Sequence, residues 1–194
     1  MSQQSALFGF DPAVPTDRLF LGLFPDPASA ARIAVLGEHV CRRHGLCVPR
    51  HQVERLHVTL FHIGDWAGLP AATVETAIDA AAALRMAPFD VRFDEIVSFS
   101  GNPQRRPLVL KASAGNEALH GFRENLGREL LKVGLGRCVT RTFEPHVTLA
   151  YAPQAVVAEP VEPIVWRATE FALIHSLLGQ TRYVPLGNWP LLAA

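Results

Sequence analysis

The sequence predicts an α+β fold built from two related lobes. Segments typical of strands and of amphipathic helices alternate along the 194 residues, and several strands are joined by short turns. One tetrapeptide occurs twice, once in each half of the chain. Each half also contains strand, helix and hairpin segments in comparable amounts, so we expect two similar lobes.

The composition is that of a globular protein. Apolar residues make up 49% of the chain and charged residues 19%, and 18 Lys and Arg balance 18 Asp and Glu. This excludes a disordered chain and argues against a protein that coats nucleic acid through a basic surface, but it leaves a local phosphate site open. The three cysteines have no paired spacing and no apolar run reaches 18 residues. We therefore expect a reduced, cytoplasmic protein without a membrane span.

The first elements follow a short leader. Residues 1–16 lack the basic start and long apolar stretch of a signal peptide, so we expect a flexible leader and a single bilobal domain over 17–194. The apolar run 19–24 predicts a buried strand. A helix is expected from Pro27, with its cationic last turn ending at Gly45.

The middle of the chain predicts a strand, a helix and a hairpin. Alternating apolar residues indicate a strand over 55–63, and Pro88 ends a second helix. Strands over 89–99 and 108–112 flank a turn-rich segment. The apolar stripe of the helix consists of Val74, Ile78, Ala81 and Leu84.

A third helix and further strands complete the chain. A strand is expected over 146–151, and closing strands within 164–177 and 183–189. The apolar positions of the helix recur every three or four residues: Leu119, Phe122, Leu126, Leu130 and Val133.

The repeated tetrapeptide carries the functional signal. His57-Val58-Thr59-Leu60 recurs as His146-Val147-Thr148-Leu149, on a predicted strand each time. Side chains alternate across a strand, so each copy buries two aliphatic residues and presents an imidazole beside a hydroxyl. If the two strands meet at a cleft, two imidazoles and two hydroxyls face one ligand.

Such a set suits acid–base chemistry at phosphorus. A neutral imidazole takes a proton from the attacking oxygen, and a protonated one donates a proton to the leaving oxygen. The hydroxyls of Thr59 and Thr148 can donate to the non-bridging oxygens, where charge accumulates. We therefore expect His57 and His146 to be catalytic and the two threonines to bind phosphate, with no metal and no cofactor.

The paired motifs resemble those of the two-histidine (2H) phosphoesterase superfamily, and most closely its 2′-5′ RNA ligase, or RNA 2′,3′-cyclic phosphodiesterase, branch. The likeness extends over most of the chain, through segments 18–25, 56–64, 99–110 and 145–150. It implies two lobes of mainly antiparallel sheet with helices around a central cleft. The family usually has an aromatic residue where this chain has His62, and often an arginine after the second motif, where this chain has Ala150-Tyr151.

The resemblance implies a specific reaction. The enzyme would open an RNA or nucleotide 2′,3′-cyclic phosphate to a 2′-phosphate, and slowly join 2′-5′ linkages without ATP. By the same resemblance, His146 would activate water and His57 would protonate the leaving oxygen, although the identical motifs cannot order these roles. The expected partners are RNA or nucleotide ends, with no membrane and no metal, and the protein is expected to be a monomer.

Other classes of hydrolase fit the sequence less well. Alternation places His57 and His62 on opposite strand faces, which is unsuitable for one metal ion, and no zinc-type spacing occurs. The phosphate-binding loop of nucleotide triphosphatases and the nucleophile elbow of serine hydrolases are also missing. A non-catalytic module that binds phosphate ends through the same cleft remains the alternative. Candidate residues for steering RNA are Arg55, Arg105, Arg106, Arg141 and Arg182.

Overall fold

The computed structural model describes residues 13–192, which form one antiparallel sheet with three α-helices. The order of the strands in the sheet is β6-β3-β4-β5-β2-β1-β7-β8. The strands are β1 (Asp17–Leu23), β2 (Val58–Trp66), β3 (Phe89–Ser98), β4 (Arg106–Lys111), β5 (His146–Ala152), β6 (Glu159–Ala168), β7 (Glu170–Leu177) and β8 (Arg182–Pro190). The helices are α1 (Pro27–Arg43), α2 (Ala71–Ala83) and α3 (Glu117–Lys132). The predicted α+β class is confirmed.

The sheet consists of two four-stranded halves, which are the two lobes. β2-β1-β7-β8 form one lobe and β6-β3-β4-β5 form the other. In the sheet of residues 13–192, the two halves pair with each other where β2 meets β5, through the antiparallel pair Val58 and Val147. The lobes do not coincide with the two halves of the chain, because the C-terminal hairpin β7-β8 returns to pair with β1. The lobe β2-β1-β7-β8 therefore combines strands from both ends of the chain.

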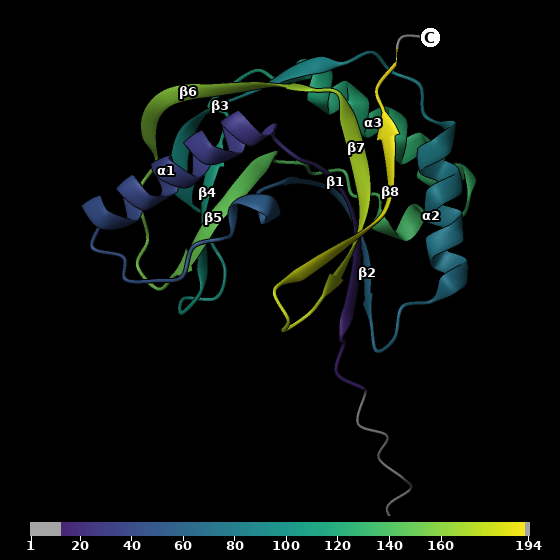
Figure 1. Cartoon of the computed structure of the whole chain (residues 1–194), viewed down its shortest axis with the longest axis horizontal. Coiled ribbons are helices and arrows are strands. Elements are labelled where there is room, and N and C mark those ends of the chain that lie inside the picture. Colours follow the sequence, from purple (N-terminus) through teal and green to yellow (C-terminus); the bar gives the residue numbers. More distant parts are fainter. Residues whose placement is uncertain (1–12, 193–194) are drawn as a thin grey trace, which may run out of the picture.

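The helices form two groups on opposite sides of the molecule, with α1 on one side and α2 and α3 on the other (Figure 1). α1 packs on β5 and β6, where Gly37 lies against Leu149. α2 and α3 pack on each other at the other side of the molecule. The ring of Phe122 on α3 meets that of Phe171 on β7 at 5.3 Å between centroids. The helix-covered face holds the main core, and a separate small apolar cluster of Phe20, Ala172 and Ile174 lies apart from it.

The largest differences from the predicted boundaries lie at β2, β6 and β7. The segment expected as the start of a strand at 55 is a short 3₁₀ turn, Val53–Arg55, and β2 begins at Val58. The segment 164–177 is divided into β6 and β7 by Thr169. β6 also starts earlier, at Glu159, and contains two prolines, which an edge strand tolerates because one of its sides carries no ladder.

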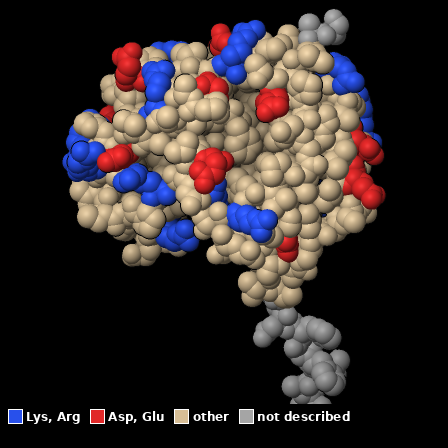
Figure 2. All heavy atoms as spheres, in the orientation of Figure 1, with Lys and Arg blue, Asp and Glu red and all other residues tan. Residues whose placement is uncertain are grey.

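The N-terminal segment of the described chain is already bonded to the sheet. Residues 1–12 of the predicted leader lie outside the described residues, and the backbone of Thr16 already bonds to Trp66 and Leu178. Within residues 13–192, no helix is long and apolar enough to cross a membrane. Figure 2 shows Lys and Arg side chains on both sides of the indentation between the two halves, at the lower edge of that view.

Candidate active site

The junction of the lobes brings the two motifs together. Val58 pairs with Val147 in antiparallel register. Continuing that register by one residue places His57 opposite Thr148 and Thr59 opposite His146. Directly opposite residues lie about 5 Å apart and diagonal ones about 7–8 Å apart in such a pair. The two histidines therefore occupy one diagonal of a small square and the two threonines occupy the other.

Both imidazole rings are held in the same way. The Nδ1–H of His57 donates to the carbonyl oxygen of Arg55, and that of His146 donates to the carbonyl oxygen of Glu144, each at 2.7 Å. Because a carbonyl oxygen only accepts, Nδ1 must carry a proton in both rings. Nε2 is then the atom that accepts or donates a proton. In His57 this atom lies 3.0 Å from the hydroxyl of Thr59.

A bulge follows each motif and changes which side chains face the cleft. Leu60 is the first of two extra residues in the pairing of β2 with β1, the second being Ile63, and Leu149 is the extra residue in the pairing of β5 with β4. Two consecutive residues are then buried, Leu60 with Phe61 and Leu149 with Ala150. The fifth residue after each motif histidine is therefore returned to the cleft face.

These fifth residues are His62 and Tyr151, and both line the cavity that contains the motifs. The prediction that His62 lies on the opposite face from His57 is wrong, because strict alternation fails at a bulge. The Nε2 of His62 lies 2.7 Å from Asp65, whose carboxylate also accepts two bonds from Arg18. The guanidinium of Arg18 holds the pKa of Asp65 down to about 2.

The ring of His57 is enclosed by aromatic side chains. The centroids of Phe20, Tyr183 and Phe24 lie 4.7, 5.5 and 5.7 Å from that of His57. Burial in this setting lowers the pKa of His57 to about 4, only partly opposed by the bond to the carbonyl of Arg55. In the free protein at neutral pH, His57 is therefore uncharged.

The ring of His146 is more open. One aromatic residue, Phe99, meets it edge-on with centroids 4.8 Å apart. Burial lowers the pKa of His146 below its ordinary value, but the carbonyl and the negative charge of Glu144 oppose that shift. The two rings thus share a geometry but differ in their surroundings.

The motifs open into a cavity of about 820 Å³. Its lining includes both histidines and both threonines, which confirms that the four side chains lie together. Within residues 13–192, its lining contains no Asp or Glu. Its basic residues are Arg18, Arg50, Arg55 and Arg105. Although the chain has no net charge, this cavity is suited to anions.

Sequence reasoning identified only part of the cavity. Of the candidate arginines, Arg55 and Arg105 line the cavity, and three do not. The three are Arg106, Arg141 and Arg182. Arg18, Arg50 and Tyr183 were missed, because each reaches the site from an element that lacks a motif. No cluster of three or more metal-binding side chains is found within residues 13–192.

Comparisons with known proteins identify the family. The family model described as the 2′-5′ RNA ligase superfamily matches residues 25–180. The structure resembles E. coli LigT complexed with 3′-AMP, with a TM-score of 0.72 and 23% identity over 92% of this chain and 99% of that one. It also resembles TT0787 of Thermus thermophilus, with a TM-score of 0.71 and 23% identity over 91% and 98% of the two chains. A search of curated protein sequences finds no match. The chain belongs to the 2′-5′ RNA ligase superfamily of two-histidine phosphoesterases.

Proposed function

We propose that this phosphoesterase is a metal-independent RNA 2′,3′-cyclic phosphodiesterase that forms a 2′-phosphate. The observation that carries the proposal is the pairing of Val58 with Val147, since it brings two imidazoles, each held through Nδ1, to one anion-binding cavity. A phosphate held between Thr59 and Thr148 would have one imidazole on each side. His57, His146, Thr59 and Thr148 are the residues that we assign to the reaction.

The reaction can be written with these four side chains alone. The neutral Nε2 of one histidine takes a proton from water, and the water oxygen forms a bond to phosphorus. The bond from phosphorus to the 3′-oxygen breaks, and the other histidine donates its Nε2 proton to that oxygen. The threonine hydroxyls and nearby arginines stabilise the charge on the non-bridging oxygens. The product keeps its phosphate on the 2′-oxygen.

The surroundings of the rings support the order of roles that the resemblance implies. His146 has the more open environment and Glu144 nearby, so it is the stronger base and would activate water. Enclosed His57 is the stronger acid once protonated and would protonate the leaving oxygen. The negative charge of a bound phosphodiester would help His57 to take up its proton.

A substrate with sulfur in place of the 3′-bridging oxygen tests this order. A thiolate is a much weaker base than an alkoxide and leaves without a proton donor. His57→Ala is therefore expected to recover much of its lost rate on this substrate, whereas His146→Ala is not. Recovery in His146→Ala alone would reverse the two roles.

The proposed substrates are RNA or nucleotide ends that carry a cyclic phosphate. Related structures of E. coli LigT are described as complexes with 3′-AMP and with phosphate, which supports a nucleotide ligand here. Slow ATP-independent formation of 2′-5′ linkages would be the same ring opening, with an RNA 5′-hydroxyl in place of water as the group that attacks phosphorus. We further propose that the protein acts as a cytoplasmic monomer.

Phosphorus NMR of the reaction with a nucleoside 2′,3′-cyclic phosphate in EDTA tests the function. We expect the cyclic signal to be replaced by that of a 2′-phosphate, and no turnover by the folded double variant His57→Ala/His146→Ala. Binding of the cyclic phosphate without turnover would instead establish the non-catalytic module. Loss of activity in EDTA, restored by a divalent ion, would reject the metal-independent mechanism.

A further inference from the structure

A second cavity, which we call the groove, adjoins the catalytic cleft. It has a volume of about 470 Å³, within the range of about 300–1,000 Å³ for small-molecule sites. Its floor includes Ala172 and Ile174, which belong to the small apolar cluster outside the main core. The pairing of β7 with β8 places Asn188 beside Ala172 and Pro185 beside Ile174. The floor is therefore apolar, with an amide next to it.

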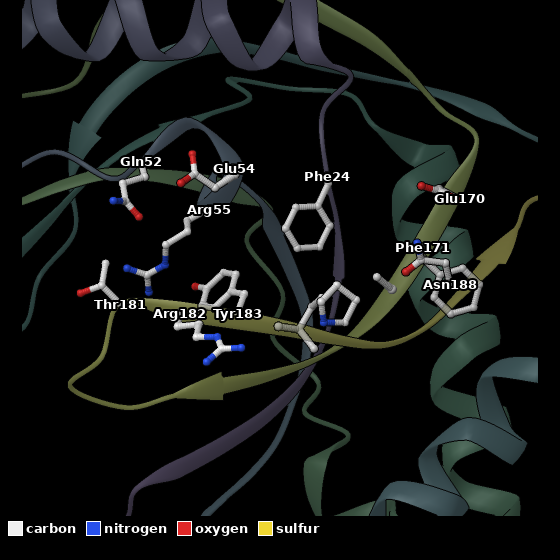
Figure 3. Close-up of a pocket in the computed structure, with 13 residues that line it drawn as sticks. Phe24, Gln52, Glu54, Arg55, Glu170, Phe171, Thr181, Arg182, Tyr183 and Asn188 are labelled. Carbon is white, nitrogen blue, oxygen red and sulfur yellow. The ribbon is translucent and has the colours of Figure 1, made fainter.

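The groove and the cleft share one wall. Arg55, Thr181 and Tyr183 line both cavities, and Figure 3 shows the guanidinium of Arg55 beside the ring of Tyr183. The carbon at the centre of that guanidinium lies 4.4 Å from the ring centroid. Phe24, which lines the groove, also contacts the ring of His57. A ligand in the groove would thus contact side chains that themselves pack against the ring of His57.

Arg55 in this wall has unused hydrogen-bonding capacity. Its Nε is buried and has no hydrogen-bond partner, and it forms no ion pair with a carboxylate in residues 13–192. A buried guanidinium nitrogen without a partner is costly, because it has lost its water. An anion lying between the two cavities would supply an acceptor, and a phosphate suits the fork of an arginine.

We infer that the groove binds the nucleobase of the nucleotide that precedes the cyclic-phosphate end. This inference rests on the proposed function. The cleft would hold the terminal nucleotide with its cyclic phosphate, and Arg55 would bind the phosphate that joins the two nucleotides. The preferred substrate is then an RNA end of at least two nucleotides, not a mononucleotide.

The chemistry of the groove fits a base. Bases of single-stranded RNA stack on aromatic rings and form hydrogen bonds through their edges. Phe24 and Tyr183 offer ring surfaces, and Glu170 and Asn188 lie together at the far end of the groove in Figure 3. A carboxylate accepts a bond from an amino group on a base, and an amide both accepts and donates.

Steady-state kinetics on two substrates test the inference. One is a nucleoside 2′,3′-cyclic phosphate, and the other is a dinucleotide ending in the same cyclic phosphate. Stacking of one additional base corresponds to a gain of about 10–100-fold, so we expect kcat/KM to be higher by that factor for the dinucleotide. Asn188→Trp, at an exposed position, is expected to block the groove and remove this preference while mononucleotide hydrolysis continues.

Two further variants make the outcome decisive. Ala172→Leu fills the floor directly and is expected to remove the same preference if Asn188→Trp does not fold. Val165→Trp, at an exposed position of β6 outside both cavities, is the matched control and is expected to keep the preference for the dinucleotide. Equal kcat/KM on both substrates, or a preference that survives in a folded groove variant, would overturn the inference. Absence of turnover on both substrates would instead reject the proposed function.

Discussion

Strands β2 and β5 carry the same tetrapeptide and hold it in the same way, yet their histidines lie in different environments. Each imidazole donates to the carbonyl two residues earlier, and each motif is followed by a bulge. Three aromatic rings surround His57, whereas His146 contacts one and lies near Glu144. The repeat thus provides two equivalent proton-transfer groups, and the residues outside it make their acidities different.

The bulges are also supported by different means. The carbonyl of Leu60 accepts a bond from the side chain of Arg123, and the carbonyl of Leu149 accepts one from the backbone of His51. In both cases the backbone carbonyl of the extra residue accepts a hydrogen bond from a residue that is not in the neighbouring strand. The same local shape, with a side chain returned to the cleft, is therefore produced twice by unrelated contacts.

The largest effect is expected from removing the motif histidines. His57→Ala and His146→Ala should each lower turnover of a 2′,3′-cyclic phosphate by about 10²–10⁴-fold, since each removes one proton-transfer group. The double variant should be little worse than either single one, because the two rings act as a unit. Steady-state hydrolysis, with circular dichroism to verify folding, measures this. Near-normal activity in a folded single variant would mean that the repeat is structural.

A smaller loss is expected from the threonines. Thr59→Val and Thr148→Val keep the shape but remove the hydroxyl, so each should lower kcat by about 10²–10³-fold if the hydroxyl stabilises the charged phosphate oxygens. Thr59 also contacts Nε2 of His57, so its replacement should alter the pH profile as well. A folded valine variant with unchanged kcat would exclude that threonine from the reaction.

The difference between the two rings should shift the pH profile. Ordinary histidines titrate near pH 6.5, which would place a bell-shaped optimum near neutrality. The pKa of His57 is lowered to about 4 and that of His146 is also lowered, so kcat/KM should peak below pH 6.5. An anionic substrate favours the protonated ring and should move the optimum of kcat to higher pH. Coincident optima of kcat and kcat/KM at about pH 7 would contradict the lowered pKa of His57.

The smallest effect is expected from the position after the bulge. His62→Ala removes a side chain that lines the cleft but is already hydrogen-bonded to Asp65. KM should therefore rise only a few-fold, with kcat unchanged. Measuring kcat and KM separately on the same substrate distinguishes the two. A loss of kcat comparable to that of His57→Ala would assign His62 to proton transfer.

The sequence was sufficient to predict the elements that depend on local pattern. The strands, the helices and the clustering of both motifs in one cavity follow from periodicity and from the repeat. The position of His62 could not be predicted, because the bulge at Leu60 is visible only in the pairing of β2 with β1. Pairing partners are distant in the chain, and a shift of one residue exchanges the faces of a strand.

The pairing of the C-terminal hairpin β7-β8 with β1 was not predicted, for a related reason. β7 pairs with β1 although most of the chain separates them, and no local pattern encodes such a contact. The same long-range pairing brings Tyr183 beside His57. Analysis of the motifs therefore could not predict that Tyr183 packs against the ring of His57.

A crystal structure of the protein soaked with inorganic phosphate at neutral pH tests the central claim most directly. We expect one phosphate between Thr59 and Thr148, with hydrogen bonds to both hydroxyls and to Nε2 of both histidines, and with no metal at bonding distance. A phosphate bound elsewhere, with this cleft left without one, would contradict the assignment of the four motif side chains to a single catalytic site.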